Sequence, residues 1–411
     1  MNVLRDYQID TVEAVKAEWK HTQSVCVVAP PGAGKTEIAM ACVAPEKGKT
    51  LWVVHQTDLA LQAEQRLRTR FGNGAVGSIR GGHTSNPNAV VDVATVQSLT
   101  NHNNRAKLTG YDLCYLDECH HYAAEEWSSV CAAQEGGFDR ILGGTATPQR
   151  ADGKPLGDIF DSLVARISYS QLIADGYLIT PRIATPGSYL HGDWAQNPLD
   201  AWSDYGQWNG ICWLPSKAHA RHYTEELELR RVDAASILDD TRRQDRRLTI
   251  ERFESGIVVM IFNVSTMLEG IDLPMCRCGI LARPFYTIGC YLQSTGRLLR
   301  PDPQGREKVV IDLTGAVARH GLPYQDRTYS LSGKDPISGG SKPVQRGERE
   351  DPQVLGIKLH DDFGDSRPDP EKLSEPDQGW LQEKRLRERK YRDLVARCGR
   401  DAADSAMRKS A

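Results

Sequence analysis

Short apolar runs alternate with helical stretches over two separate parts of the chain. In the first part, from Ser24 to Gly144, the runs are Ser24–Ala29, Thr50–Val54, Val90–Ala94, Tyr111–Asp117 and Arg140–Gly143. Helical stretches such as Asp58–Arg70 separate them. This alternation is typical of a parallel sheet that is wrapped by helices.

The same rhythm returns between Ile211 and Leu313. The strands predicted there are Ile211–Leu214, Ile257–Phe262, Gly279–Leu281 and Lys308–Leu313, with helices between them. The pattern therefore predicts two α/β domains in tandem, at residues 1–150 and 210–331.

The remaining segments have a different composition. Residues 151–209 include an irregular, aromatic-rich piece that we expect to be a connector packing on the domain surfaces. Residues 332–378 are rich in Pro, Gly and Asp, which favours a linker or an extended arm. Residues 379–411 form a basic tail with a helical pattern, either a solvated helix or a nucleic-acid contact.

Composition adds little to this picture. A chain of 411 residues with 26% charged residues is long enough for two domain cores. The net charge of -3 gives no sign of a polyanionic partner, so a nucleic acid would have to meet a local basic surface. No run approaches the roughly 20 apolar residues of a membrane span, and the ten cysteines lack paired CxxC spacing. We expect a soluble, cytoplasmic protein with reduced thiols.

A glycine-rich loop follows the first predicted strand and precedes a helix. It consists of Pro30-Pro31-Gly32-Ala33-Gly34-Lys35-Thr36. The glycines let backbone N–H groups approach phosphate oxygens, Lys35 supplies charge for the β and γ phosphates, and the Thr36 hydroxyl is placed to coordinate Mg²⁺. Ala29 stands where the strict GxxxxGK[ST] pattern has its first glycine, which leaves the anion-binding part intact.

Two carboxylates, Asp117 and Glu118, end the apolar strand that begins at Tyr111. A buried strand delivers such groups to the carboxyl edge of the sheet, where ligands bind in open α/β folds. We predict that Asp117 holds Mg²⁺ through water and that Glu118 orients and deprotonates the attacking water.

Two other interpretations of this region are open. The acidic pair could cap a helix. A zinc site could use Cys119, His120, His121 and Cys131, although the spacing does not match a structural zinc cluster with two ligand pairs.

Further motifs, in order along the chain, resemble the superfamily 2 helicases with a DExH box, especially the DNA-repair type and its phage-encoded relatives. The resemblance covers Leu4 to about Leu331. The motifs that carry it are Arg5-Asp6-Tyr7-Gln8, Val54-His55-Gln56-Thr57, Ala94-Thr95-Val96-Gln97-Ser98-Leu99, Asp117-Glu118-Cys119-His120, Thr145-Ala146-Thr147-Pro148, Cys212-Trp213-Leu214-Pro215-Ser216, Thr266-Met267-Leu268-Glu269-Gly270-Ile271-Asp272-Leu273-Pro274 and Gln293-Ser294-Thr295-Gly296-Arg297-Leu298-Leu299-Arg300. The resemblance implies two RecA-like domains that clamp one nucleotide.

Together with the phosphate loop, the resemblance assigns a role to individual residues. Nucleotide binding is expected of Arg5, Gln8, Pro31, Gly32, Ala33, Gly34, Lys35, Thr36, Gly270 and Asp272. Catalysis is expected of Lys35, Asp117, Glu118, Gln293, Arg297 and Arg300. Coupling of hydrolysis to strand movement is expected of His120, Thr145 and Thr147, and backbone contacts of His55, Gln56, Thr57, Thr95, Gln97, Ser216 and Thr266.

The spacing of Arg297 and Arg300 is i, i+3, so a helix would place both guanidinium groups on one face. The resemblance points that face at the nucleotide, where both residues would act as arginine fingers. A surface salt-bridge patch is the alternative. Two residues depart from the family pattern: Cys119 replaces the usual Ala, and Ser294 replaces an Arg that often follows the glutamine.

These residues predict a nucleic-acid-dependent ATPase and DNA helicase, with ATP and Mg²⁺ as cofactors and single-stranded or branched DNA as partner. A bacterial or phage-infected cell is the expected setting. The alternatives are a duplex translocase that does not separate strands, an RNA helicase, a non-motor ATP-dependent scaffold and a small-molecule kinase. The second α/β domain argues against the kinase.

Overall fold

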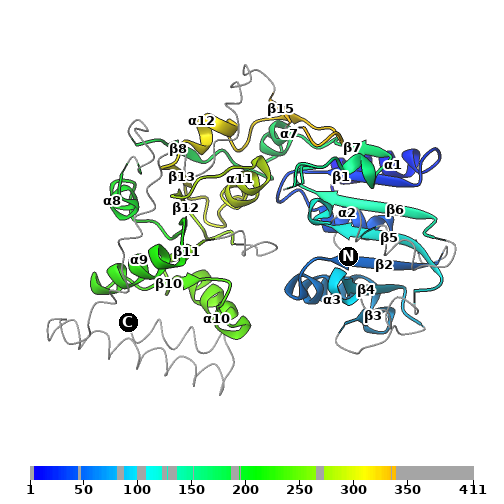
Figure 1. The fold of residues 1–411 in the computed structure, drawn as a ribbon, viewed down its shortest axis with the longest axis horizontal. Coiled ribbons are helices and arrows are strands. Elements are labelled where there is room, and N and C mark those ends of the chain that lie inside the picture. Colours follow the sequence, from blue (N-terminus) through cyan, green and yellow to red (C-terminus); the bar gives the residue numbers. More distant parts are fainter. Residues whose placement is uncertain are drawn as a thin grey trace. The chain divides into compact units, whose positions relative to one another are not determined.

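The computed structural model describes residues 4–44, 48–80, 88–99, 108–122, 127, 137–150, 152–186, 194, 196–264, 273–334 and 336–338. These residues form two compact units, and each unit is built on its own sheet (Figure 1). The first unit contains the described residues of Met1–Thr180, Phe285–Pro301 and Val317–Gln345. The second contains Pro181–Pro284 and Asp302–Ala316.

A seven-stranded parallel sheet in the order β3-β4-β2-β5-β6-β1-β7 forms the centre of the first unit. Its strands are β1 (Ser24–Val28), β2 (Lys49–Val54), β3 (Val76–Ile79), β4 (Val91–Thr95), β5 (Tyr111–Asp117), β6 (Arg140–Thr145) and β7 (Ser162–Val164). The predicted parallel sheet is thereby confirmed.

The central strands of this sheet are covered on both faces. Every residue of β1 is buried, and successive side chains enter different cores, with Val25 and Val27 in one and Cys26 and Val28 in the other. This is the reason for the continuous apolar run in the sequence, because a parallel strand between two helical layers has no solvent face.

Helices and short elements of the first unit complete it. They are α1 (Asp6–Glu18), α2 (Lys35–Cys42), α3 (Thr57–Phe71), η1 (Asn73–Ala75), α4 (Val96–Leu99), η2 (Cys119–His121), η3 (Leu156–Asp158), α7 (Tyr169–Ala174), α11 (Ile288–Thr295) and α12 (Ala316–His320). A small antiparallel pair, β14 (Arg327–Thr328) and β15 (Ile337–Ser338), follows. In α3 the buried residues Leu59, Ala63 and Leu67 recur at helical spacing and pack toward the core.

The second unit repeats the architecture on a smaller scale. Its six-stranded parallel sheet has the order β10-β11-β9-β12-β13-β8. The elements are β8 (Arg182–Ala184), α8 (Pro198–Asp204), β9 (Gly210–Trp213), α9 (Lys217–Leu229), β10 (Ala234–Ile237), α10 (Arg243–Glu254), β11 (Met260–Asn263), β12 (Cys278–Leu281) and β13 (Val309–Asp312).

Residues 151–209 are more regular than the sequence led us to expect. They contain β7 and α7 in the first unit and β8 and α8 in the second, and each strand forms an edge of its sheet. Trp202 of α8 is buried in the second core, and Trp194 Nε1 donates to Ala282 O at 2.7 Å. The segment is therefore more regular than expected, because short edge strands lack a long apolar run in the sequence, and its role as a connector stays a prediction. The domain limits at residues 150 and 210 stay a prediction.

Several sequence predictions concern residues outside the described ranges. Thr266, Gly270 and Asp272 are among them, as are nearly all of the predicted linker and the whole basic tail. The segment Gln293–Arg300, by contrast, is described, and α11 groups with the first unit although it lies between β12 and β13 of the second unit along the chain.

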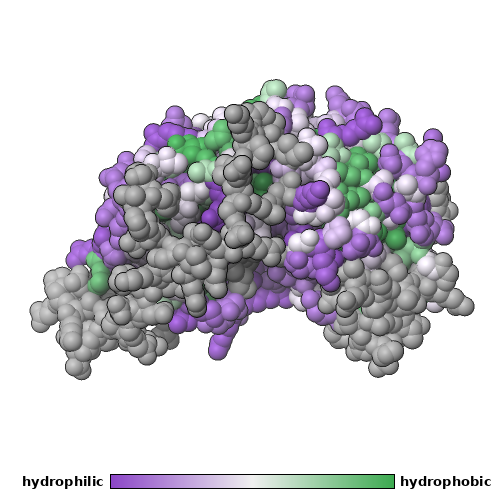
Figure 2. Space-filling model, turned by 45° about the horizontal axis from the view of Figure 1, so that its top comes forward, coloured by the Kyte–Doolittle hydropathy of each residue, from purple (hydrophilic) through white to green (hydrophobic). Residues whose placement is uncertain are grey.

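The face shown in Figure 2 is mainly hydrophilic and carries small apolar patches. Among the described helices, none combines the length and the apolar character that a membrane crossing requires. The eight cysteines that the structure describes are all free thiols, and seven of these are buried.

Gly210 should be sensitive to a single added methyl group. A Cβ at this position of β9 would lie 2.3 Å from the backbone oxygen of Cys278 on the paired strand β12. Backbone atoms cannot rotate away as a side chain can, so Gly210→Ala should destabilise the protein by about 1–3 kcal/mol. Urea unfolding followed by circular dichroism measures this. Gly74→Ala, where a Cβ meets nothing within 4 Å, is the control, and equal stability of both variants would refute the expectation.

Candidate functional site

The loop between β1 and α2 combines two left-handed glycines with the start of a helix. Gly32 has a φ of 90° and Gly34 a φ of 81°, which favours glycine at both positions. A Cβ on Gly34 would also lie 2.4 Å from Gln8 Nε2. The first N–H groups of α2 carry partial positive charge, which suits a phosphate. The predicted phosphate loop thus has a geometry that fits an anion.

The start of the chain holds this loop through the carbonyl oxygen of Ala33. Gln8 Nε2 donates to it at 3.0 Å, and the Tyr7 hydroxyl donates to it at 3.2 Å. Gln8 Oε1 accepts from the backbone N–H of Arg5 at 3.0 Å, and the Arg5 guanidinium lies 3.8 Å from the ring centre of Tyr177. The structure therefore places Arg5 and Gln8 beside the phosphate loop. Tyr177 was missed because it lies in the segment expected to be a connector.

Lys35 and Glu118 form an ion pair within the site. Lys35 Nζ lies 3.3 Å from Glu118 Oε1, and the two side chains are 13% and 21% exposed. Glu118 has a left-handed backbone, with φ 47° and ψ 56°. A residue with a side chain pays about 1–2 kcal/mol for this conformation, and such strain concentrates at functional sites. The predicted phosphate lysine and the predicted water-activating carboxylate are thus brought together.

Asp117, at the end of β5, lies half-buried beside this pair. Its Oδ1 accepts from the Tyr115 hydroxyl at 3.1 Å and from the backbone N–H of Glu118 at 3.2 Å. Burial raises the pKa of Asp117 to about 6, the charge of Glu118 raises it as well, and the charge of Lys35 lowers it. The Asp117 carboxyl and the Thr36 hydroxyl are hard oxygen ligands of the kind that Mg²⁺ prefers, so this donor set fits the ion.

The zinc alternative gains no support from the described residues, which contain no group of three or more His, Cys, Asp or Glu that could hold a metal ion. Cys119 Sγ lies 3.7 Å from Cys26 Sγ, and both residues are buried. Burial raises the pKa of the Cys119 thiol, which keeps it protonated and a poor metal ligand. Cys131 lies outside the described residues.

His120 connects the acidic residues to Thr145 and Gln293. The Thr145 hydroxyl donates to Thr147 O at 2.7 Å, so it accepts from His120 Nδ1, which lies 2.9 Å away. His120 Nε2 then accepts from Gln293 Nε2 at 3.1 Å. His120 Nδ1 also lies 3.6 Å from Glu118 Oε2. These contacts fit a neutral imidazole that carries its proton on Nδ1.

The chain after α11 packs closely against the phosphate loop. A Cβ on Gly296 would lie 2.6 Å from Pro31 Cγ, and a Cβ on Gly32 would lie 3.4 Å from Arg300 Nε. Glycine at position 296 therefore permits the contact, and Arg300 lies beside the loop that it was predicted to approach.

One expectation about the two arginines is wrong. The helix α11 ends at Thr295, Gly296 caps it, and a turn follows in which Leu298 N donates to Thr295 O at 2.9 Å. Arg297 and Arg300 therefore do not share a helical face, because the helix stops before either residue. Arg297 is buried, with 8% of its surface exposed.

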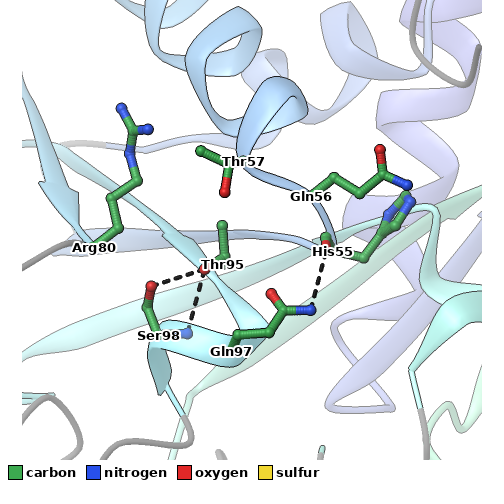
Figure 3. A pocket seen from close by; sticks show the side chains of 7 residues that line it. All are labelled: His55, Gln56, Thr57, Arg80, Thr95, Gln97 and Ser98. Carbon is green, nitrogen blue, oxygen red and sulfur yellow. Dashed lines mark hydrogen bonds between the residues drawn. The ribbon is translucent and has the colours of Figure 1, made fainter. Parts of the chain in front are cut away.

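A pocket of about 730 Å³ lies at the ends of β2 and β4 (Figure 3). Its lining contains His55, Gln56, Thr57, Arg80, Thr95, Gln97 and Ser98. Gln97 Nε2 donates to His55 O at 3.2 Å, and the Thr95 and Ser98 hydroxyls lie 2.8 Å apart. The pocket thus brings together all five nucleic-acid residues that the sequence predicted in the first domain.

Arg80 was missed as a pocket residue because it follows β3, an edge strand that the apolar pattern did not show. Glu64 of α3 holds its guanidinium, with Nη2 at 2.8 Å and Nε at 3.1 Å from Oε1. Glu64 is buried and also pairs with Arg68 at 3.4 Å. Arg80 is therefore a charged group on the pocket wall that a buried carboxylate keeps in place.

Two other predicted residues, Ser216 and Thr36, make contacts that are not part of the groups described above. Ser216 is in the second unit, where its hydroxyl accepts from His219 N and caps α9. Thr36 Oγ1 accepts from Arg66 Nη1 at 3.3 Å.

Comparison with known proteins agrees with this arrangement of motifs. Residues 2–150 match the family described as Type III restriction enzyme, res subunit, and residues 204–302 match the Helicase conserved C-terminal domain. A DNA 3'-5' translocase, XPB2 of Sulfurisphaera tokodaii, is 36% identical over 174 residues, which cover 42% of this chain and 36% of the relative. These matches and the motifs make the chain similar to the superfamily 2 helicases.

Other relatives are consistent with this similarity. The putative ATP-dependent helicase IRC3 of Saccharomyces cerevisiae is 24% identical over 356 residues, which cover 76% of this chain and 52% of the relative. The structure of the Mycobacterium smegmatis helicase Lhr bound to ssDNA and AMP-PNP matches with a TM-score of 0.57 at 18% identity, over 80% of this chain and 49% of that one. This likeness concerns the fold, which is that of two tandem RecA-like domains. The chain spans about half of the yeast relative and about a third of the archaeal one.

The tautomer of His120 can be measured directly. We expect the neutral ring to carry its proton on Nδ1, because Thr145 accepts there and Gln293 donates at Nε2. Nitrogen-15 spectra of the histidine-labelled protein at alkaline pH distinguish the two tautomers. The signal that disappears in His120→Ala belongs to His120. A proton found on Nε2 would contradict the hydrogen-bond assignment.

Proposed function

We propose that this chain is an ATP-driven helicase or translocase that acts on DNA. One observation carries the proposal: Lys35, Glu118, His120 and Gln293 form a continuous set of contacts of 3.6 Å or less in one unit. These residues come from the phosphate loop, from Asp117-Glu118-Cys119-His120 and from the segment Gln293–Arg300. These three segments must meet if nucleotide hydrolysis is to depend on movement of the chain.

Lys35 is the residue that would bind the β and γ phosphates. In this structure its charge is balanced by Glu118 at 3.3 Å. An arriving phosphate would compete for Lys35 and leave the Glu118 carboxylate to accept a proton from the attacking water. Thr36 and Asp117 would hold Mg²⁺, which when bound neutralises charge on the phosphates.

Arg297 and Arg300 are the proposed arginine fingers. Arg300 lies against Gly32 of the phosphate loop, so a guanidinium group is present beside the site. A finger stabilises charge that develops on the transferred phosphoryl group and contributes about 10³ to 10⁵ in rate. A change in the position of the chain after α11 would therefore switch hydrolysis on or off, which is what a motor requires.

The pocket at His55, Thr95 and Gln97 is the proposed contact to the nucleic-acid backbone. Hydroxyl, amide and guanidinium groups line it, and these are the donors that phosphate oxygens accept. Such contacts carry no base information, so we expect little sequence preference and a steep dependence on salt. DNA is proposed over RNA because the archaeal relative is described as a DNA translocase. That description equally supports translocation without strand separation, which remains the second candidate.

Glu118→Gln should separate nucleotide binding from turnover. The amide keeps the size of the side chain but cannot take a proton, so we expect the ATP hydrolysis rate at saturating DNA to fall by roughly 10² to 10⁴ while ATP still binds. Lys35→Ala is the companion variant and should lose binding itself. Fluorescent-nucleotide titration beside a phosphate-release assay measures both. Normal hydrolysis by Glu118→Gln would contradict the role given to the carboxylate.

Arg80→Ala should weaken DNA binding by about tenfold and make the salt dependence shallower by about one unit of slope, because one phosphate contact is lost. Fluorescence anisotropy at several salt concentrations measures both effects. The matched control is Arg68→Ala, which also removes an arginine from Glu64 but is not part of the pocket lining. If Arg68→Ala weakens binding equally, Arg80 acts through the fold and not through the phosphate.

A further inference from the structure

Three histidine rings lie in one continuous stack beside the nucleotide site. The ring centres of His55 and His121 are 4.1 Å apart with an interplanar angle of 33°. Those of His121 and His120 are also 4.1 Å apart, with an angle of 39°. His121 therefore contacts a ring on each side.

The sheet register explains why these residues meet. Strands β2 and β5 are paired in parallel, with Val53 opposite Leu116. His55 follows the end of β2, and His120 and His121 follow the end of β5. Parallel neighbours end at the same edge, so the residues that leave them are adjacent.

The two ends of the stack belong to different sites. His55 lines the proposed nucleic-acid pocket, and its backbone oxygen accepts from Gln97 in that pocket. His120 contacts Thr145, Gln293 and Glu118 in the hydrolytic site. If a bound strand displaced His55, the movement would be transmitted through two ring contacts to His120, which contacts Glu118.

We propose that His121 is a positioning residue that couples occupancy of the pocket to ATP hydrolysis through these ring contacts. This inference rests on the proposed function. His121 is exposed apart from the stack, so its replacement removes no core side chain. His121 is neither among the residues proposed to bind the nucleotide or Mg²⁺ nor part of the pocket lining.

His121→Ala tests the coupling. We expect the ATP hydrolysis rate without DNA and the half-saturating DNA concentration to stay as in the wild type, while the stimulation by saturating DNA falls by about tenfold, within the usual range of coupling between two sites. His121→Phe keeps a flat ring in the stack and should restore most of the stimulation. The measurement is a phosphate-release assay with no DNA, a single-stranded oligonucleotide and a duplex of the same sequence.

The matched control is His222→Ala, which removes a half-buried histidine that also contacts an aromatic ring, that of Tyr223. Full stimulation in His121→Ala, or a Phe variant no better than the Ala variant, would overturn the inference. So would a loss of the DNA-independent rate in His121→Ala, since His121 would then act in hydrolysis itself. If DNA does not stimulate ATP hydrolysis by the wild-type protein, the proposed function itself is overturned. The phosphate-release assay of the wild type, with and without DNA, reveals that case.

Discussion

Parallel strands end at the same edge of a sheet, and this constraint organises the whole candidate site. Lys35, Glu118 and Thr145 follow or end β1, β5 and β6, which are neighbours in the sheet, whereas His55 and Thr95 follow or end β2 and β4. The order of the strands therefore divides the edge into a nucleotide side and a pocket side. The border lies between β2 and β5, where the histidine rings meet.

Close approach of backbone segments is the second requirement of the site. Gly34 lets the phosphate loop pass against Gln8, and Gly296 lets the chain after α11 pass against Pro31. In each contact a neighbouring side chain, Gln8 or Pro31, occupies the space that a Cβ on the glycine would need. The loop is therefore packed against two other segments of the chain. The ion pair of buried Glu64 with half-buried Arg80 serves the pocket, because it fixes the position of a charge that a flexible side chain would otherwise carry.

Much of this arrangement could be predicted from the sequence, for a physical reason. The central strands are buried on both faces, so β1, β2 and β5 are continuous apolar runs that the pattern revealed, and the motif residues at their ends followed from that. The strands that the pattern missed, β3, β7, β8 and β10, are the edges of the two sheets. They are three or four residues long with mixed burial, and Arg80, which follows β3, was missed together with that strand. The end of α11 was missed because a spacing of three residues does not reveal where a helix stops.

At position 118 the left-handed backbone favours glycine, whereas the proposed chemistry needs a carboxylate. A residue without a side chain would adopt the same φ and ψ at no cost, so the chain gives up stability to keep a carboxylate there. Glycine there would relieve the strain but would also remove the carboxylate that pairs with Lys35, so backbone stability and this ion pair make opposite demands on position 118.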